Sequence, residues 1–244
     1  MPPASGRGGR GCARCRTCEG PYVPFNLWFS RERVPRRAER RTDTGFPVLI
    51  PGEDDGPVAE PTFRYHPDPL ASGSAVRSGH VCGVCGMDRQ IRYRGPVYGR
   101  QPDSLCLPCI HSGAASRALS IPGGGDGDSG MAAMFSDAVD VPDDVPLSVV
   151  EEITRRTPGF AGWQQEAWLY HCGDGAAFLG PAGYRELEAH PEALAMLRED
   201  RRRHGWSPAA TEEFLRELDR TGEPTAYLFR CLHCGTGLAS WDIG

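Results

Sequence analysis

Two Cys-x-x-Cys pairs separated by 20 residues constrain the fold of this 244-residue chain more than any other feature. The segments CGVCG and CLPC supply Cys82, Cys85, Cys106 and Cys109. Such pairs present thiolates at tight turns, and four thiolates complete the tetrahedral coordination of Zn²⁺ without leaving a position for a substrate. The spacing therefore predicts a structural zinc site. A strand within QIRYRGPVY and a helix after CLPC would give a treble-clef or zinc-ribbon-like finger.

A third pair, Cys231 and Cys234 in FRCLHCG, needs ligands from elsewhere in the chain. The remaining cysteine of residues 59–244 is Cys172, in the segment HCGDG. If two hairpins bring these turns together, three thiolates meet and predict a second zinc site. The alternative without a metal is a core thiol at Cys172 and a reduced pair at the C-terminal turn.

The fourth ligand of this second site stays open among the neighbours of these cysteines. His171 is favoured, because imidazole suits zinc better than a lone carboxylate among thiolates. Asp174 is the alternative, because residues i and i+2 share one face of a regular strand, as Cys172 and Asp174 would. His233 ranks third, because it lies between the paired cysteines and would point away from the metal.

The order of the expected elements predicts an α+β fold in four stretches. Residues 1–58 are rich in Gly, Pro and Arg, and we expect a disordered arm or a mis-called start, although Cys12, Cys15 and Cys18 lie there. Residues 59–120 are expected to form a four-cysteine zinc finger unit that opens with a strand at FRYH. Residues 121–140 read as a linker or insertion, and residues 141–244 as an α+β unit with the second metal site.

In this last unit, two β-hairpins are expected to flank a helical segment. Asp144 is the expected N-cap of a helix at PLSVVEEITRR, and Ser207 is that of SPAATEEFLRELDR. EAWLYHC and AAFLG are expected to pair around a GDG turn. TAYLFRC and LASWDI are expected to pair around the C-terminal cysteines, with helices at PAGYRELEAH and PEALAMLREDRRR between the hairpins.

Charge and hydropathy disfavour two classes of partner. All 27 basic residues are Arg, and residues 58–244 hold 17 of them against 25 acidic residues. Nonspecific nucleic-acid binding depends on phosphate neutralisation, so an acidic body argues against it. No apolar run reaches the roughly 20 residues of a membrane span, and the N-terminus lacks the apolar core of a signal peptide. A cytoplasmic protein that does not contact a membrane is the expectation.

Several motifs together closely resemble the CbrC family of small bacterial proteins over residues 61–244. They are FRYHPDPLASGS, CGVCG, YRGPVY, CLPCIHSGAAS, RTPGFAGWQQEAWLYHCGDGAAFLG and PTAYLFRCLHCG. The resemblance implies that the seven cysteines of residues 82–234 form the family pattern, with His or Cys at position 171 and, in some relatives, a further Cys in place of Gly175. The family name refers to tolerance of a DNase-type colicin, which implies a role in colicin tolerance or stress response without a defined activity.

Three functions follow as hypotheses. The first is a zinc-stabilised binding or regulatory protein that meets an unidentified protein partner through Trp163 and Trp168. The second is a zinc-dependent hydrolytic enzyme in which three thiolates leave one coordination position open and Asp174 or His171 acts as general base. The third is a nucleic-acid-binding zinc protein that uses the basic run Arg201, Arg202 and Arg203. The sequence has no Gly-rich phosphate loop, His-Glu-x-x-His helix or Gly-x-Ser-x-Gly elbow, which favours the first.

Overall fold

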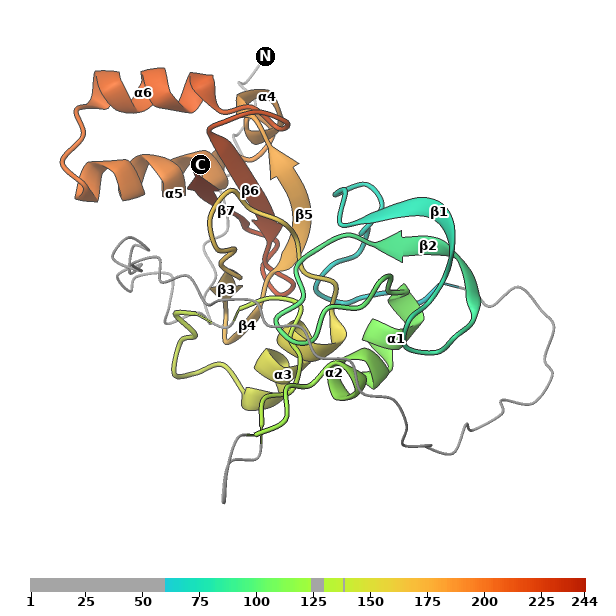
Figure 1. Ribbon diagram of the computed structural model, residues 1–244. Helices are drawn as coiled ribbons and strands as arrows, with labels where there is room; N and C mark the ends of the chain where they lie inside the picture. Colours follow the sequence, from blue (N-terminus) through green and yellow to red (C-terminus); the bar gives the residue numbers. More distant parts are fainter. Residues whose placement is uncertain (1–59, 124–129, 138) are drawn as a thin grey trace, which may run out of the picture. The chain divides into compact units, whose positions relative to one another are not determined.

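The computed structural model describes residues 60–123, 130–137 and 139–244, and these residues form an α+β fold (Figure 1). The predicted fold class is therefore confirmed. The expectations for residues 1–58, including those for Cys12, Cys15 and Cys18, lie outside the described residues. The elements follow in the order β1 (Ala75–Val81), β2 (Asp88–Tyr93), α1 (Leu107–His111), α2 (Ala114–Ala118), α3 (Leu147–Arg156), β3 (Tyr170–His171), β4 (Asp174–Gly175), β5 (Ala177–Ala182), α4 (Tyr184–Leu187), α5 (Pro191–Arg203), α6 (Pro208–Glu217), β6 (Thr225–Arg230) and β7 (Gly237–Asp242).

The first antiparallel hairpin and α1 have the arrangement expected of a treble-clef-like finger. β1 and β2 pair with Ala75 opposite Tyr93 and Val81 opposite Asp88, and the first cysteine pair lies in the turn between them. The second pair follows a loop, with Cys106 at the N-cap of α1. Hairpin, knuckle and helix therefore converge on the four cysteines.

The expected strand at FRYH is wrong, and β1 was not foreseen. Residues 60–74 contain no strand. Phe63 belongs to the core of the finger, whereas Tyr65 packs in the aromatic core beside β5. The apolar side chains of this segment alternate because they enter two different cores. The backbone of this segment is hydrogen-bonded to the larger sheet, because Phe178 N–H of β5 donates to the Tyr65 carbonyl at 2.8 Å.

The three-stranded antiparallel sheet β5-β6-β7 has β6 at its centre. Alternate residues of a strand point to opposite faces. Ala226 and Leu228 accordingly enter the core formed with helices α4, α5 and α6, whereas Tyr227 and Phe229 enter an aromatic core with Trp168. The nearly continuous apolar run of β6 thus follows from burial on both faces of the sheet.

The helices agree with the sequence in their positions but not in every cap. Ser207 caps α6 as expected, since its side chain accepts a hydrogen bond from Ala210 N–H at 3.2 Å. Asp144 does not cap α3. Pro146 holds the N-cap position without a side-chain hydrogen bond, so the helix begins later than expected. In the part of the chain that the structure describes, no helix is long and apolar enough to cross a membrane.

The two hairpins differ in how well they match the expectation. β6 and β7 pair around the C-terminal cysteines, as expected. The first expected hairpin is wrong in its register: β3 and β4 pair around Cys172 and Gly173, and β5 instead pairs with β6. The turn therefore places a cysteine at its tip.

The segment expected as a linker makes ordered contacts where it is described. Ile121 and Met131 form an isolated bridge, and Tyr98 and Met134 form another. Phe135 is fully buried in the finger core. The proposed boundaries at residues 120 and 141 remain a prediction.

Candidate metal centres

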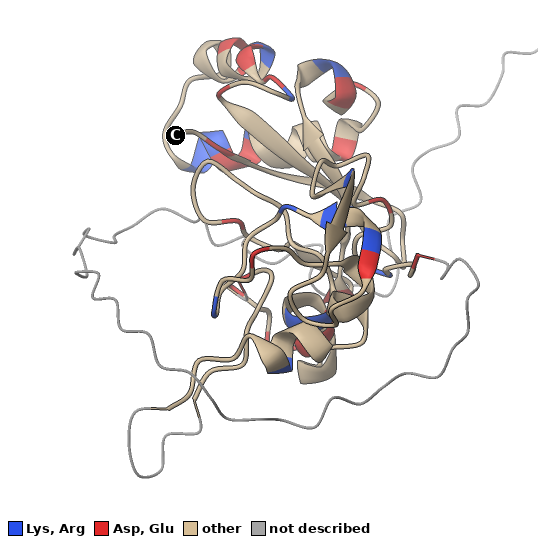
Figure 2. Cartoon of the chain, turned by 45° about the vertical axis from the view of Figure 1, so that its right-hand side comes forward, with Lys and Arg blue, Asp and Glu red and all other residues tan. Residues whose placement is uncertain are grey.

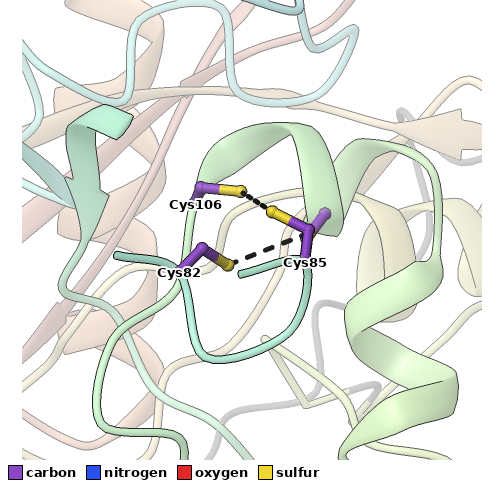
Figure 3. Close-up of side chains that lie close together, drawn as sticks. Cys82, Cys85 and Cys106 are labelled. Carbon is purple, nitrogen blue, oxygen red and sulfur yellow. Dashed lines mark hydrogen bonds between the residues drawn. The ribbon is translucent and has the colours of Figure 1, made fainter. Parts of the chain in front are cut away.

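The four cysteines of the finger lie close enough to share one ion, and Figure 3 shows sulfur atoms of this group directed toward one another. The Sγ atoms of Cys82 and Cys109 are 3.9 Å apart, and so are those of Cys85 and Cys106. A disulfide requires about 2.05 Å. A tetrahedron with Zn–S bonds of about 2.3 Å has edges of about 3.8 Å. The cluster therefore has the dimensions of a four-thiolate metal site.

Both Cys-x-x-Cys-Gly turns have the same backbone geometry. Gly86 N–H donates to the Cys82 carbonyl at 2.8 Å, and Gly235 N–H donates to the Cys231 carbonyl at 3.1 Å. In each turn the N–H two residues after the first cysteine also donates to that cysteine's sulfur, at 3.5 and 3.4 Å. Gly86 and Gly235 have φ angles of 69° and 77°, a conformation that glycine adopts at little cost. The repeated sequence pattern thus builds the same ligand-presenting turn twice.

The crowded thiols of the first cluster need a cation before all can ionise. Hydrogen bonds with Cys106 and Cys82 raise the pKa of the Cys109 thiol, because a proton shared with neighbouring sulfurs is harder to remove. Burial and repulsion between negative sulfurs raise it further. A divalent cation would remove this repulsion. Partial burial alone lowers the pKa of Arg89, but its interactions with Cys85 and the other sulfurs raise it above the usual value. Arg89 therefore offsets part of the negative charge, a role that the sequence did not indicate.

A second cluster consists of His171, Cys172, Cys231 and Cys234, whose ligand atoms lie within 4.8 Å of one another. The Sγ atoms of Cys172 and Cys234 are 3.8 Å apart. His171 Nδ1 lies 3.2 Å from the first sulfur and 3.4 Å from the second, near the edge of about 3.6 Å in a zinc tetrahedron. Burial lowers the pKa of His171, which favours the neutral imidazole that a metal requires. These four residues could hold a metal ion.

The turn between β3 and β4 explains why His171 belongs to the cluster. Cys172 and Gly173 have φ angles of 57° and 70°, as in the two-residue turns that suit hairpins. The alternation of side chains along a strand does not apply to a residue with positive φ. The argument that would pair Cys172 with Asp174 on one strand face therefore fails at this turn.

Asp174 lies outside the second cluster, and its carboxylate has other partners. Oδ2 accepts hydrogen bonds from Arg64 Nη2 at 2.6 Å and from His233 Nε2 at 2.8 Å, whereas Oδ1 accepts one from Tyr65 Oη at 2.8 Å. Burial alone raises the pKa of Asp174, but the bonds from Tyr65 and His233 and the charge of Arg64 lower it below the usual range. The carboxylate thus holds His233 outside the cluster and is poorly placed to act as ligand or general base.

Position 175 cannot supply a ligand to the second cluster in this chain. A Cβ atom on Gly175 would lie 2.4 Å from Ile153 Cδ1 and 3.1 Å from the Tyr65 ring. A cysteine there would point into the aromatic core. His171 is the residue that lies in the cluster with the three cysteines.

The two tryptophans proposed as interface anchors have different environments. Trp168 is 2 % exposed and packs in the aromatic core, where its indole N–H donates to the Ala176 carbonyl at 3.0 Å. Trp163 is 51 % exposed, and its indole N–H donates to the Gly222 carbonyl and to Thr225 Oγ1. The interpretation of Trp168 as a surface anchor is therefore wrong, and Trp163 remains available at the surface.

The three consecutive arginines at residues 201–203 do not form an open basic patch. Arg201 is 5 % exposed, and its guanidinium carbon lies 4.0, 3.5 and 3.7 Å from the ring centres of Trp206, Phe214 and Trp241. Arg202 and Arg203 both pair with one acidic residue of α5, Glu199. Figure 2 shows basic and acidic positions interleaved on the helices of this part. The run is thus largely neutralised or buried.

Comparison with known proteins assigns this chain to a family. The family model described as "Uncharacterised protein family (UPF0167)" matches residues 61–243. UPF0167 protein Mb2317 of Mycobacterium bovis and UPF0167 protein MT2352 of Mycobacterium tuberculosis are each 47% identical over 194 residues, which is 78% of this chain and 97% of theirs. UPF0167 protein PA1536 of Pseudomonas aeruginosa is 38% identical over 188 residues, which is 75% of this chain and 96% of that protein.

These findings correct the family assignment made from the motifs. The matching model and the curated relatives carry the name UPF0167 and not CbrC, and none of them mentions colicin tolerance. The motifs identified a real family pattern over nearly the same residues but attached the wrong name to it. No solved structure matches this chain.

Proposed function

The chain belongs to the UPF0167 family, and we propose that it is a zinc-stabilised binding or regulatory protein whose metal ions support the fold. The observation that carries the proposal is the presence of two separate clusters, each with four Cys or His ligands. Four protein ligands complete the coordination of a structural zinc, whereas a catalytic zinc keeps a position for water or substrate. The hydrolytic alternative is disfavoured for this reason.

Each cluster lies where a bound metal ion would cross-link parts of the chain. Cys82, Cys106 and Cys109 are buried among the apolar residues of the finger, which has only two short strands and two short helices. A small unit of this kind needs additional cross-links to be stable. The second cluster joins the β3–β4 turn to the β6–β7 turn, which are some 60 residues apart in sequence. Both ions would act as internal cross-links.

The donor atoms favour zinc over the other common metals. Thiolates with imidazole are soft or borderline ligands, whereas Mg²⁺ and Ca²⁺ prefer oxygen. Four thiolates also suit iron, so the first cluster alone does not decide between the two metals. The mixed ligands of the second cluster are typical of structural zinc sites.

A protein partner would meet the chain at a surface and not at the metals. Trp163 supports this part of the proposal, because a half-exposed indole held by two hydrogen bonds suits an interface anchor. Nucleic acid is disfavoured as the partner, because Arg201 packs against aromatic rings and because Arg202 and Arg203 form ion pairs with Glu199.

Metal removal tests the structural role. The purified protein is treated with a thiol-reactive mercurial and a chelator, and its near-ultraviolet circular dichroism is recorded before treatment, after it, and after thiol regeneration with Zn²⁺ or, as a control, Mg²⁺. We expect the tertiary signal to disappear with the metal and to return with Zn²⁺ alone. An unchanged spectrum in the metal-free protein would contradict the proposal. A visible absorption band in the untreated protein would indicate iron in place of zinc.

A further inference from the structure

A small cavity lies apart from both metal clusters. Its volume is about 120 Å³, well below the roughly 300–1,000 Å³ of sites for drug-sized ligands. The wall combines residues 72–74, residues 94–95 after β2, residues 160–161 and side chains of β5 and β6. None of these lining residues belongs to either cluster. The cavity needs an explanation of its own.

Ser72 gives the cavity a hydrogen-bond acceptor. Ser72 lines it, and Ser72 Oγ lies 2.7 Å from Nε2 of the fully buried His66. His66 Nδ1 lies 2.6 Å from the Pro158 carbonyl, which only accepts, so the proton of the neutral ring is on Nδ1 and Nε2 accepts from the hydroxyl. The Pro69 carbonyl, 3.2 Å from Ser72 Oγ, already accepts a hydrogen bond from Ala75 N–H at 2.8 Å. Ser72 Oγ also accepts a hydrogen bond from Ser74 N–H at 3.4 Å. With its proton on His66, the hydroxyl therefore keeps one of its two lone pairs for a ligand.

Arg94 gives the cavity a cationic hydrogen-bond donor. This exposed arginine lines the cavity and, among the described residues, has no ion pair or side-chain hydrogen bond. An unpaired guanidinium can bind a carboxylate through two parallel hydrogen bonds. The cavity therefore combines a cationic donor with a neutral acceptor.

Ser74 also lines the cavity, and the apolar part of the wall comes mainly from three side chains. Phe160 and Phe178 stack with ring centres 4.0 Å apart, and Pro181 lies beside them. Tyr227 also lines the cavity, but its hydroxyl is occupied by a hydrogen bond to Asp242 Oδ1 at 2.9 Å. A ligand would thus combine a short apolar body with two polar groups.

We propose that this cavity binds a small amino- or hydroxy-carboxylate, with the carboxylate on Arg94 and the amino or hydroxyl group donating to Ser72 Oγ. The inference deepens the proposed binding function and rests on it. L-Alanine and L-lactate have the required size and groups, and they serve as the probes.

The geometry of Ser72 and His66 also resembles a nucleophile with its base, but the surroundings favour binding over catalysis. Burial lowers the pKa of His66 to about 4, so the imidazole is a poor acceptor for the hydroxyl proton that a nucleophilic serine must release. Ser72 is therefore assigned to recognition.

The test measures the affinity of the full chain for four compounds by isothermal titration calorimetry. L-Alanine and L-lactate have both polar groups, propionate lacks the donor, and ethylamine lacks the carboxylate. We expect L-alanine or L-lactate to bind about three- to tenfold more tightly than propionate, the contribution of one hydrogen bond, and ethylamine to bind most weakly.

Three variants identify the contacts. Arg94→Gln should weaken the binding of L-lactate by about tenfold or more, whereas Arg185→Gln, an exposed arginine of α4 outside the cavity, should leave it unchanged. Ser72→Ala should remove the preference for L-lactate over propionate. If that variant does not fold, the comparison of the four compounds and Arg94→Gln still decide the question.

Three results would overturn the proposal. They are the absence of binding by both probes at millimolar concentration, full affinity in Arg94→Gln, or covalent labelling of Ser72 by a fluorophosphonate, which would identify a nucleophile. Metal content measured on the same samples separates the two proposals. Two bound ions without a ligand would contradict the cavity assignment alone.

Discussion

At the level of single side chains, Asp174 connects segments that are far apart in the sequence. Its carboxylate accepts hydrogen bonds from Arg64, Tyr65 and His233, and His233 lies within the turn that presents Cys231 and Cys234. Mutation of the outer groups that orient metal ligands commonly lowers metal affinity by about 10- to 100-fold. Asp174 therefore supports the second cluster without belonging to it.

Replacing Asp174 with Asn should weaken metal binding at one cluster only. Asn retains an acceptor for Tyr65 but loses the charge that binds Arg64 and His233. We expect about a tenfold loss of affinity at the second cluster and none at the first, measured by competition with a chromophoric chelator. Asp143→Asn, an exposed position near α3, is the matched control. Equal weakening of both clusters, or of neither, would show that Asp174 has no such role.

Glu166 gives a prediction about pH. This residue is 4 % exposed, one carboxylate oxygen has no hydrogen-bond partner among the described residues, and the other accepts from Tyr98 Oη at 2.7 Å. Burial raises its pKa to about 7, despite the bond from Tyr98. The folded state therefore holds this proton more tightly than the unfolded state, whose pKa lies near the ordinary value of about 4.5. Its stabilising contribution is complete below that value and is lost as pH rises through about 7.

Glu166→Gln should remove this pH dependence. Between pH 5 and pH 8 the wild type should lose on the order of 2–3 kcal/mol of unfolding free energy relative to the variant. Urea denaturation of both proteins at a series of pH values gives the difference between their unfolding free energies. The other titrating groups are the same in both proteins, so their contributions cancel in this difference. Parallel pH profiles would mean that the pKa of Glu166 is the same in the folded and unfolded states.

Among the secondary-structure elements, the β3–β4 hairpin is the one most sensitive to side-chain size. Gly175 of β4 faces Ile153 of α3 and Tyr65, and a Cβ atom there would lie 2.4 Å from the Ile153 side chain. Gly175→Ala should therefore destabilise the protein by about 1–3 kcal/mol through overpacking. Gly79→Ala in β1 is the control, because the nearest atom to its Cβ would be 3.9 Å away. Midpoints of urea unfolding give both values, and equal midpoints would contradict the packing argument.

The elements also show what the sequence could and could not predict. The knuckles, α1, α5, α6 and the β6–β7 hairpin were predictable, because Cys-x-x-Cys-Gly turns, Ser207-Pro208 capping and apolar patterns are local signals. The pairing of β5 with β6 was not, since it joins residues far apart in the sequence, from Ala177 with Arg230 to Ala182 with Ala226. FRYH was misread because its apolar residues serve two cores. His171 was favoured for its chemistry, but Asp174 could be set aside only once the positive φ of Cys172 was known.

For the molecule as a whole, the two clusters support different cores. The first is surrounded by the finger core, which includes Ile91, Leu105 and Ile110. The second holds the β3–β4 turn at the end of the sheet, away from the core that α5 and α6 form with β6 and β7. Loss of one metal should therefore loosen one region and not the other.

Hydrogen exchange measured by mass spectrometry checks this division. Cys106→Ser should raise exchange in β1, β2 and α1 and leave α5 and α6 protected. Cys172→Ser should raise exchange in β3, β4 and the Cys231–Cys234 turn and leave the finger protected. A uniform rise of exchange over residues 60–244 in both variants would show instead that the two metals stabilise one cooperative unit.

Metal content per chain is the most direct test of the central claim that both clusters are metal sites. Native mass spectrometry combined with elemental analysis gives the number and identity of bound ions for the wild type, Cys106→Ser and Cys172→Ser. We predict two zinc ions in the wild type and one in each variant. One zinc in the wild type, unchanged by Cys172→Ser, would contradict the claim and leave His171, Cys172, Cys231 and Cys234 as a cluster without a metal.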